Sequence, residues 1–128
     1  METVLHRIAE GAGSQPGVAL ARVWLVDRGD ICSTCPMRAE CPDQTRCLHL
    51  VASHGHPTKA GEDWSRLDGA FRRFPMGVRK VGRVGASGQA ILIKDVSADM
   101  QEFARAEWIR DEKIVSFGCQ PLVFRGEV

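Results

Sequence analysis

Apolar residues along the chain follow first a helical and then a strand-like spacing. Four apolar residues within Thr3–Glu10 recur on one helix face, and glycines follow as stop signals at positions 11 and 13. The run Val18–Val26 is apolar except at Arg22, as in a strand covered on both faces. Leu48–Ser53 alternates between faces and predicts a second, antiparallel strand. The residues expected on one face of that strand are Leu48, Leu50 and Ala52.

Shorter elements are predicted in the second half of the chain. Val78–Ala86 spaces valines three apart, which predicts a helix, and Gly88 is placed to end it. Gln89–Val96 contains the branched run typical of a strand. The other predicted elements are a strand at Phe71–Met76, a helix at Glu102–Lys113, a strand at Val115–Phe124 and a hairpin turn at residues 125–127. This order predicts an α+β domain with a mostly antiparallel sheet.

Length, composition and charge indicate a single domain without a general affinity for nucleic acid or membranes. The chain has 128 residues, 44% of them hydrophobic, which suits one domain with a real core. Seventeen basic and sixteen acidic residues give a net charge of +1, so there is no general attraction to nucleic acid or anionic lipid. No apolar run is long enough for a membrane span, and the first residues do not resemble a signal peptide. We therefore expect a cytoplasmic protein that has no membrane partner.

Four of the five cysteines lie within sixteen residues, between the first two predicted strands. Cys32, Cys35, Cys41 and Cys47 are separated by two, five and five residues. The CxxC pair supplies two ligands from one tight turn, and each later span is long enough to return to the same centre. In a reducing compartment such spacing is more typical of ligands than of structural disulfides. We therefore predict a metal site made of these four residues.

The spacing leaves the bound group open among three alternatives. A cysteine pair followed by a third cysteine after five residues, with a proline directly after a ligand, looks like the loops that hold iron–sulfur clusters, which favours a 4Fe-4S cluster. Four thiolates also suit a tetrahedral zinc ion. The third alternative is that the thiols are free or form disulfides.

Several charged or titratable residues accompany the cysteines. Arg38 and Arg46 lie inside the loop, where they either offset the charge of the thiolates or are simply solvated. His49 follows Cys47 by two residues, and we expect it on the exposed face of the strand rather than as a ligand. His54 and His56 are expected in a solvated loop.

No catalytic motif is recognisable, and we expect that the protein is not an enzyme. A single basic cluster suits a nucleic-acid backbone, but a solvated helix face or a partner surface explains it equally well. The residues of this cluster are Arg72, Arg73, Arg79, Lys80 and Arg83.

Three segments together resemble a GAF domain, a small sensory and ligand-binding module. They are residues 21–26 (ARVWLV), residues 82–96 (GRVGASGQAILIKDV) and residues 114–128 (IVSFGCQPLVFRGEV). The resemblance implies a GAF-like, PAS-like antiparallel sheet flanked by helices, with the cysteine-rich loop as an insertion between its first two strands. The loop resembles the cysteine-rich GAF modules at the N-terminus of bacterial transcriptional activators that work with an alternative sigma factor.

The resemblance also implies a domain organisation. Residues 1–128 would form one sensory domain beside the effector domain of a larger regulator, and a homodimer is expected. Because a GAF domain usually continues with another strand and a C-terminal helix, we expect the domain to be cut short at Val128. Trp64 is expected to line a ligand pocket. Cys119 is expected either as a buried inert thiol or as a further group at that pocket or at the metal site.

The sequence thus predicts a sensory GAF domain of a transcriptional or signalling regulator. Its four cysteines would hold an iron–sulfur cluster that responds to redox state or to a diatomic gas, without direct nucleic-acid binding by this domain. One alternative is a structural zinc site in a GAF regulatory module with a small-molecule pocket. The other is a zinc-ribbon-like nucleic-acid-binding domain.

Overall fold

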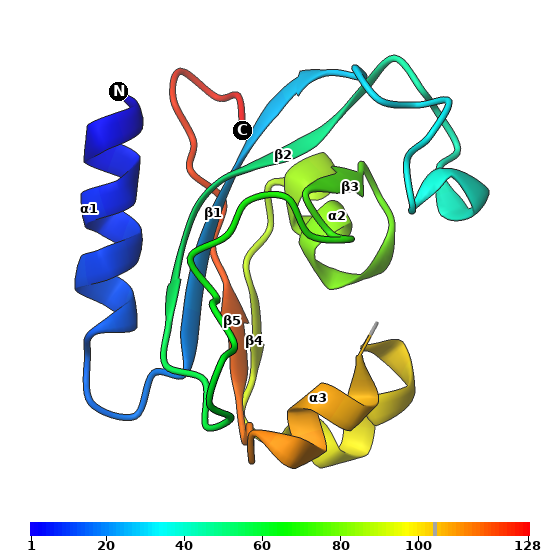
Figure 1. Ribbon diagram of the computed structural model, residues 1–128. Helices are drawn as coiled ribbons and strands as arrows, with labels where there is room; N and C mark the ends of the chain where they lie inside the picture. The colour runs from blue at the N-terminus through cyan, green and yellow to red at the C-terminus, as the bar shows by residue number, and fades with distance from the viewer. Residues whose placement is uncertain (104) are drawn as a thin grey trace.

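Two long antiparallel strands form the centre of the molecule (Figure 1). The computed structural model describes residues 1–103 and 105–128, with only the backbone of residues 99, 101 and 102. One sheet has the order β1-β2-β3, and a second sheet pairs β4 with β5, also antiparallel. The strands are β1 (Leu20–Arg28), β2 (Arg46–Gly55), β3 (Arg73–Pro75), β4 (Ile91–Ile93) and β5 (Phe117–Cys119).

Helices lie on both sides of the central strands. Figure 1 shows α1 along one side of β1 and β2, with α2 on the other side. The helices are α1 (Glu2–Gly13), α2 (Arg79–Ser87) and α3 (Ala106–Asp111), and the 3-10 helices are η1 (Arg38–Glu40) and η2 (Val96–Glu102). The predicted α+β class with antiparallel pairing is confirmed, although the strands form two sheets instead of one.

An apolar cluster joins α1 to the first face of the sheet. Leu5 and Ala9 of α1 pack against Val23 of β1 and Ala52 of β2. Helix α1 runs past Gly11 and ends at Gly13, the second of the two expected stop signals. The burial of its apolar face stabilises the helix more than Gly11 weakens it.

The pairing of β1 with β2 contains an irregularity that redirects the side chains of β2. Val23 pairs with Ala52, but the next residue of β1 pairs with Leu50, so Val51 is an extra residue. The expected common face of the three β2 residues is therefore wrong. Ala52 packs in the cluster with α1, whereas Leu48 belongs to a different cluster.

This second cluster fills the space between the sheet and α2. Met37, Leu48 and Phe74 are its buried members. Helix α2 approaches closely because of its glycines: a Cβ on Gly82 would lie 2.2 Å from the carbonyl oxygen of Pro75. Met37 comes from the connection between β1 and β2, so the cysteine-containing loop is part of the core.

The predicted elements of the second half are mostly present but shorter than expected. The predicted helix at Val78–Ala86 is confirmed as α2, and Gly88 ends it in the left-handed conformation with φ 68°. The strands predicted at Gln89–Val96 and Val115–Phe124 are only three residues long each. The helix predicted at Glu102–Lys113 is confined to α3, and part of that prediction falls on residue 104, outside the described residues.

The predicted turn at residues 125–127 is confirmed. The backbone N–H of Phe124 donates to the carbonyl oxygen of Glu127 at 2.8 Å, and the N–H of Glu127 donates back at 3.1 Å. Within the described residues, no helix is long and apolar enough to cross a bilayer.

Replacing Gly82 by alanine is expected to lower the free energy of unfolding by about 1–3 kcal/mol, because the new methyl group meets the Pro75 backbone. Gly11→Ala is the matched control, since a Cβ at Gly11 meets no atom within 4 Å among the described residues. It is expected to raise the free energy of unfolding by up to about 1 kcal/mol. Urea unfolding of both variants checks this packing, and equal effects at the two positions would contradict it.

Candidate metal centre

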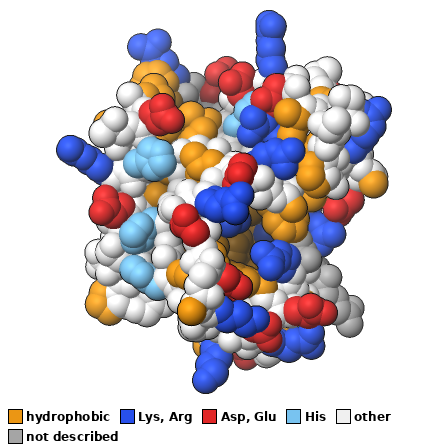
Figure 2. All heavy atoms as spheres, viewed as in Figure 1, with side chains coloured by type: hydrophobic (Ala, Val, Ile, Leu, Met, Phe, Trp, Pro, Cys, Tyr) orange, Lys and Arg blue, Asp and Glu red, His pale blue; other side chains and the backbone are white. Residues whose placement is uncertain are grey.

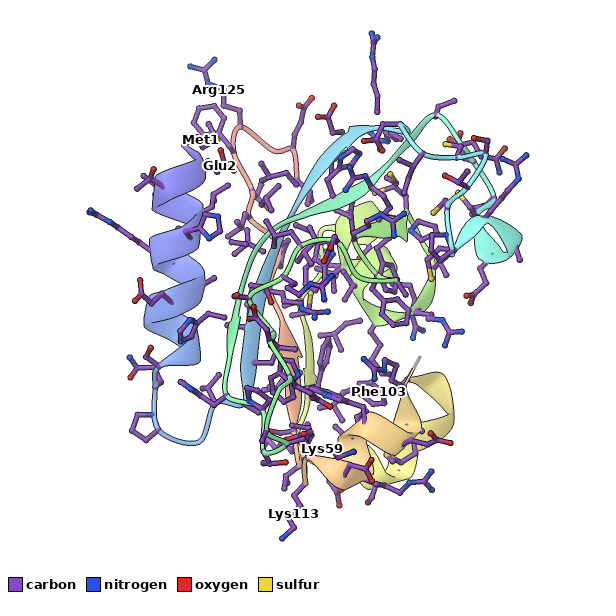
Figure 3. All side chains as sticks on the ribbon, viewed as in Figure 1. Met1, Glu2, Lys59, Phe103, Lys113 and Arg125 are labelled. Atoms are coloured by element: carbon purple, nitrogen blue, oxygen red, sulfur yellow. The ribbon has the colours of Figure 1, made fainter. Side chains whose placement is uncertain are left out.

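The four clustered cysteines line one small cavity, of about 20 Å³, at the end of the central strands. Cys32, Cys35 and Cys41 lie in the connection between β1 and β2, and Cys47 lies in β2 itself. Figure 3 shows sulfur atoms gathered at this end of the molecule. The structure therefore brings the predicted ligand residues to a common site. Whether this connection is an insertion relative to other GAF domains stays a prediction.

Local hydrogen bonds hold the two arms of the loop together. The N–H of Gly29 donates to the carbonyl oxygen of Thr45 at 3.0 Å, which extends the strand pairing into the loop. A Cβ at Gly29 would lie 2.5 Å from the carbonyl oxygen of Gln44 and 2.6 Å from Sγ of Cys32. The arms approach this closely because residue 29 has no side chain.

All four thiols are free, and two of them donate to backbone carbonyl groups of the loop. The thiol of Cys32 donates to the carbonyl oxygen of Gln44 at 3.3 Å, and that of Cys41 donates to the carbonyl oxygen of Asp43 at 3.0 Å. Among the described residues, no group of three or more His, Cys, Asp or Glu side chains is close enough to hold a metal ion as they stand. Ligation therefore requires these thiols to leave their carbonyl partners and turn into the cavity.

Cys47 is the most strongly perturbed of the four thiols. Burial raises its pKa to about 11, the nearby Arg73 opposes this shift, and Asp30, Cys32 and Cys35 add to it. At neutral pH this thiol is protonated when no cation is bound. Cys32 and Cys35 therefore lie near enough to Cys47 to act on it electrostatically, and a bound cation would favour its thiolate form.

Arg73 of β3 forms the best-defined ion pair at the cavity. Its Nε and Nη2 donate to the two carboxylate oxygens of Asp30, each at 2.7 Å. These hydrogen bonds lower the pKa of Asp30 to about 2, and they raise that of Arg73 above its usual value. The pair connects β3 to the first residues of the loop.

His49 contacts the end of β1 and the start of the cysteine loop. Its Nε2–H donates to the carbonyl oxygen of Arg28 at 2.8 Å and lies 3.9 Å from Oδ1 of Asp30. Its side chain is 14% exposed. The expectation of an exposed histidine is therefore wrong, because this hydrogen bond turns the ring against the strand end, and His49 is not among the residues that line the cavity.

Two further contacts anchor the loop to the body of the domain. Met37 is 4% exposed and packs against Leu48 and Phe74. Glu40, in η1, accepts from Nε of Arg79 at 3.0 Å, at the start of α2. The loop is thus fixed by an apolar side chain and by ion pairs to β3 and α2.

The other charged residues predicted near the cysteines lie in two places. Arg38 and Arg46 line the cavity, and Nη1 of Arg38 donates to the carbonyl oxygen of Cys32 at 2.6 Å. His54 lies at the opposite end of β2, where it pairs with Ala21, and its ring contacts that of His56. Because Cys47 pairs with Asp27, the two sites are about 20 Å apart along the strand.

Trp64 and Cys119 lie away from the cysteine cavity. Trp64 packs on Trp108, with 5.3 Å between ring centroids, and its Nε1 donates to Glu62 at 3.0 Å. Cys119 lies in β5 and pairs with Ile91 of β4, and burial raises the pKa of its thiol. Neither residue lines this cavity or a second one of about 440 Å³ beside η2 and α3. Their role in a ligand pocket stays a prediction.

The predicted basic cluster does not form a continuous basic surface. Arg73 and Arg79 are ion-paired, and Lys80 is buried with its Nζ 5.0 Å from the ring centroid of Phe103, which is labelled in Figure 3. Figure 2 shows acidic side chains interspersed among the basic ones on the face in view. These contacts leave little support for a nucleic-acid interface at this cluster.

Sequence reasoning missed Asp30, Met37, Glu40 and Arg73 as parts of the site. Met37 and Glu40 were visible inside the cysteine segment, but nothing local indicates which residues they contact. Arg73 is remote in sequence and reaches the cavity only because β3 pairs with β2.

The chain folds as a small α+β domain with a cavity lined by four cysteines. The GAF domain family matches residues 1–128, and the chain therefore belongs to this family. GAF domains have sensory or regulatory roles in general and commonly lie in larger regulators beside effector domains. No curated protein and no solved structure matches the chain.

Met37→Ala is expected to lower the free energy of unfolding by about 2–5 kcal/mol, because it removes a buried side chain from the core. The comparison is Val4→Ala on α1, which is 57% exposed and expected to change stability by about 0.5 kcal/mol or less. Both are measured by chemical unfolding in chelator and reductant. A Met37 variant as stable as the Val4 variant would show that the loop is not anchored in the core.

Proposed function

We propose that this is a cytoplasmic sensory GAF domain whose cysteine loop binds an iron–sulfur cluster. Cys32, Cys35, Cys41 and Cys47 would each supply one thiolate to a 4Fe-4S cluster. The domain would report redox state or a diatomic gas to the effector domain of a larger regulator. Following the sequence resemblance, we place it in a homodimeric bacterial transcriptional activator that works with an alternative sigma factor.

The observation that carries the proposal is that all four cysteines, each with a free thiol, are among the residues that line one cavity. Cys35 packs against the second apolar cluster, but Cys32, Cys41 and Cys47 are not among the residues of either cluster. Three arginines share the cavity wall and oppose the negative charge of thiolates. The donor set therefore fits a thiolate-bound metal group, although the thiols must turn inward to ligate it.

Such a group supplies electron-transfer chemistry or reactivity toward small oxidants when bound. The chain's own part is to hold the loop so that a change in the loop reaches the body of the domain. Met37 connects the loop to the core, Asp30 connects it to β3, and Glu40 connects it to α2. Loss of the four ligand bonds would leave these tethers in place and change the order of the loop between them.

A single zinc ion is the second candidate, and the size of the cavity favours it. A volume of about 20 Å³ is that of roughly one water-sized sphere. Tetrahedral coordination by four thiolates is typical of structural zinc. A zinc site would fix the fold of the loop, and the sensory role of the domain would then depend on a small-molecule pocket.

Anaerobically prepared protein is expected to be brown and to contain iron and sulfide in near-equal amounts. Replacing any one of the four cysteines by serine removes a thiolate ligand, so iron and sulfide should fall sharply. Cys119→Ser is the matched control and should retain both, because Cys119 does not line the cavity. Elemental and sulfide analysis of the five variants checks the assignment.

The result separates the candidates. One zinc per chain without sulfide would replace the iron–sulfur proposal by the zinc site. A colourless protein without iron or zinc would reject both, and loss of metal in Cys119→Ser alone would move the site elsewhere.

A further inference from the structure

Three arginines line the cysteine cavity, and one of them differs from the others in how it is held. Arg38 and Arg46 are exposed, so solvent and salt screen their charges. The side chain of Arg73 is 19% exposed and comes from β3, outside the cysteine segment. Solvent and salt therefore screen the charge of Arg73 less than those of Arg38 and Arg46.

The guanidinium of Arg73 is fixed by contacts on several sides. Two of its nitrogens donate to Asp30, and Nη1 donates to the carbonyl oxygen of Arg72 at 3.0 Å. The backbone of Arg73 is paired with His49 in the sheet. A group held in this way needs little reorganisation when charge appears beside it.

The proposed site is negatively charged when it is occupied, so a fixed positive group beside it would stabilise it. A divalent ion cancels only half of the charge of four thiolates, so the occupied site is an anion in a partly buried place. Arg73 lines the same cavity as Cys35 and Cys47, and its strand pairs with the strand that carries Cys47. Asp30, which also lines the cavity, accepts two hydrogen bonds from the guanidinium. The two hydrogen bonds to Asp30 therefore hold the guanidinium of Arg73 in one orientation at the cavity.

We propose that Arg73 is the positioning residue that supplies the permanent countercharge of the tetrathiolate site and so sets its affinity for metal. This inference rests on the proposed function, but it applies to a cluster and to a single ion alike. It assigns to β3 a part in the site that the cysteine segment alone does not contain.

The test uses the whole chain and Co²⁺ as the probe, because cobalt bound by thiolates gives charge-transfer bands that report sulfur ligation. Arg73→Gln is expected to lose about tenfold or more in Co²⁺ affinity, measured by chelator competition. Arg73→Lys should recover most of that loss, since it restores the charge without the planar fork. If Arg73 only supported the fold through its planar guanidinium, Arg73→Lys would not recover the Co²⁺ affinity.

Arg66→Gln is the matched control. Arg66 donates to both carboxylate oxygens of Asp68, at 2.9 and 2.7 Å, and does not line the cavity. It removes an ion pair of the same geometry and should leave Co²⁺ affinity unchanged.

Each outcome decides one point. If the wild-type chain shows no thiolate-to-cobalt band, the proposed function fails and this inference fails with it. If the wild type binds Co²⁺ but Arg73→Gln binds as tightly as Arg66→Gln, only the role of Arg73 is overturned. If Arg73→Gln does not fold, a folded Arg73→Lys that binds Co²⁺ much more weakly than wild type overturns it as well.

Discussion

The burial of Met37 between the sheet and α2 is the contact on which the rest of the site depends. It brings the middle of a seventeen-residue connection, residues 29–45, into the same apolar cluster as Leu48 and Phe74. Loops normally remain on the surface because their backbone polar groups need partners. Here successive turns satisfy much of the backbone, so one apolar side chain can enter the core while the thiols stay near the surface.

The same anchoring links the loop to segments far along the chain. Asp30 forms an ion pair with Arg73 and Glu40 forms one with Arg79, so the first residue of β3 and the first residue of α2 both contact the cysteine loop. These ion pairs are partly exposed, and each contributes little to stability by itself. They fix where charge lies around the cysteines, and they join the loop to β3 and α2.

The order of the elements and the location of the cysteines followed from local patterns, whereas the details of the site did not. Apolar periodicity was sufficient for α1, β1, β2 and α2, and Gly88 marked the end of α2. The extra residue Val51 places Ala52 and Leu48 on different faces of the sheet. The alternation of apolar and polar residues in the sequence cannot reveal such an irregular pairing. His49 was expected in solvent, but its environment depends on the carbonyl oxygen of Arg28. Arg73 was read as part of a basic cluster because its partner Asp30 lies far away in sequence.

The proposed site requires the thiolates of Cys32, Cys35, Cys41 and Cys47 to bind one common metal group. X-ray absorption at the metal edge of anaerobically prepared protein tests it most directly, because the first shell reports which atoms ligate. An all-sulfur shell is expected, with additional metal–metal scattering if the group is a cluster. A shell of oxygen or nitrogen, or protein without metal, would contradict it.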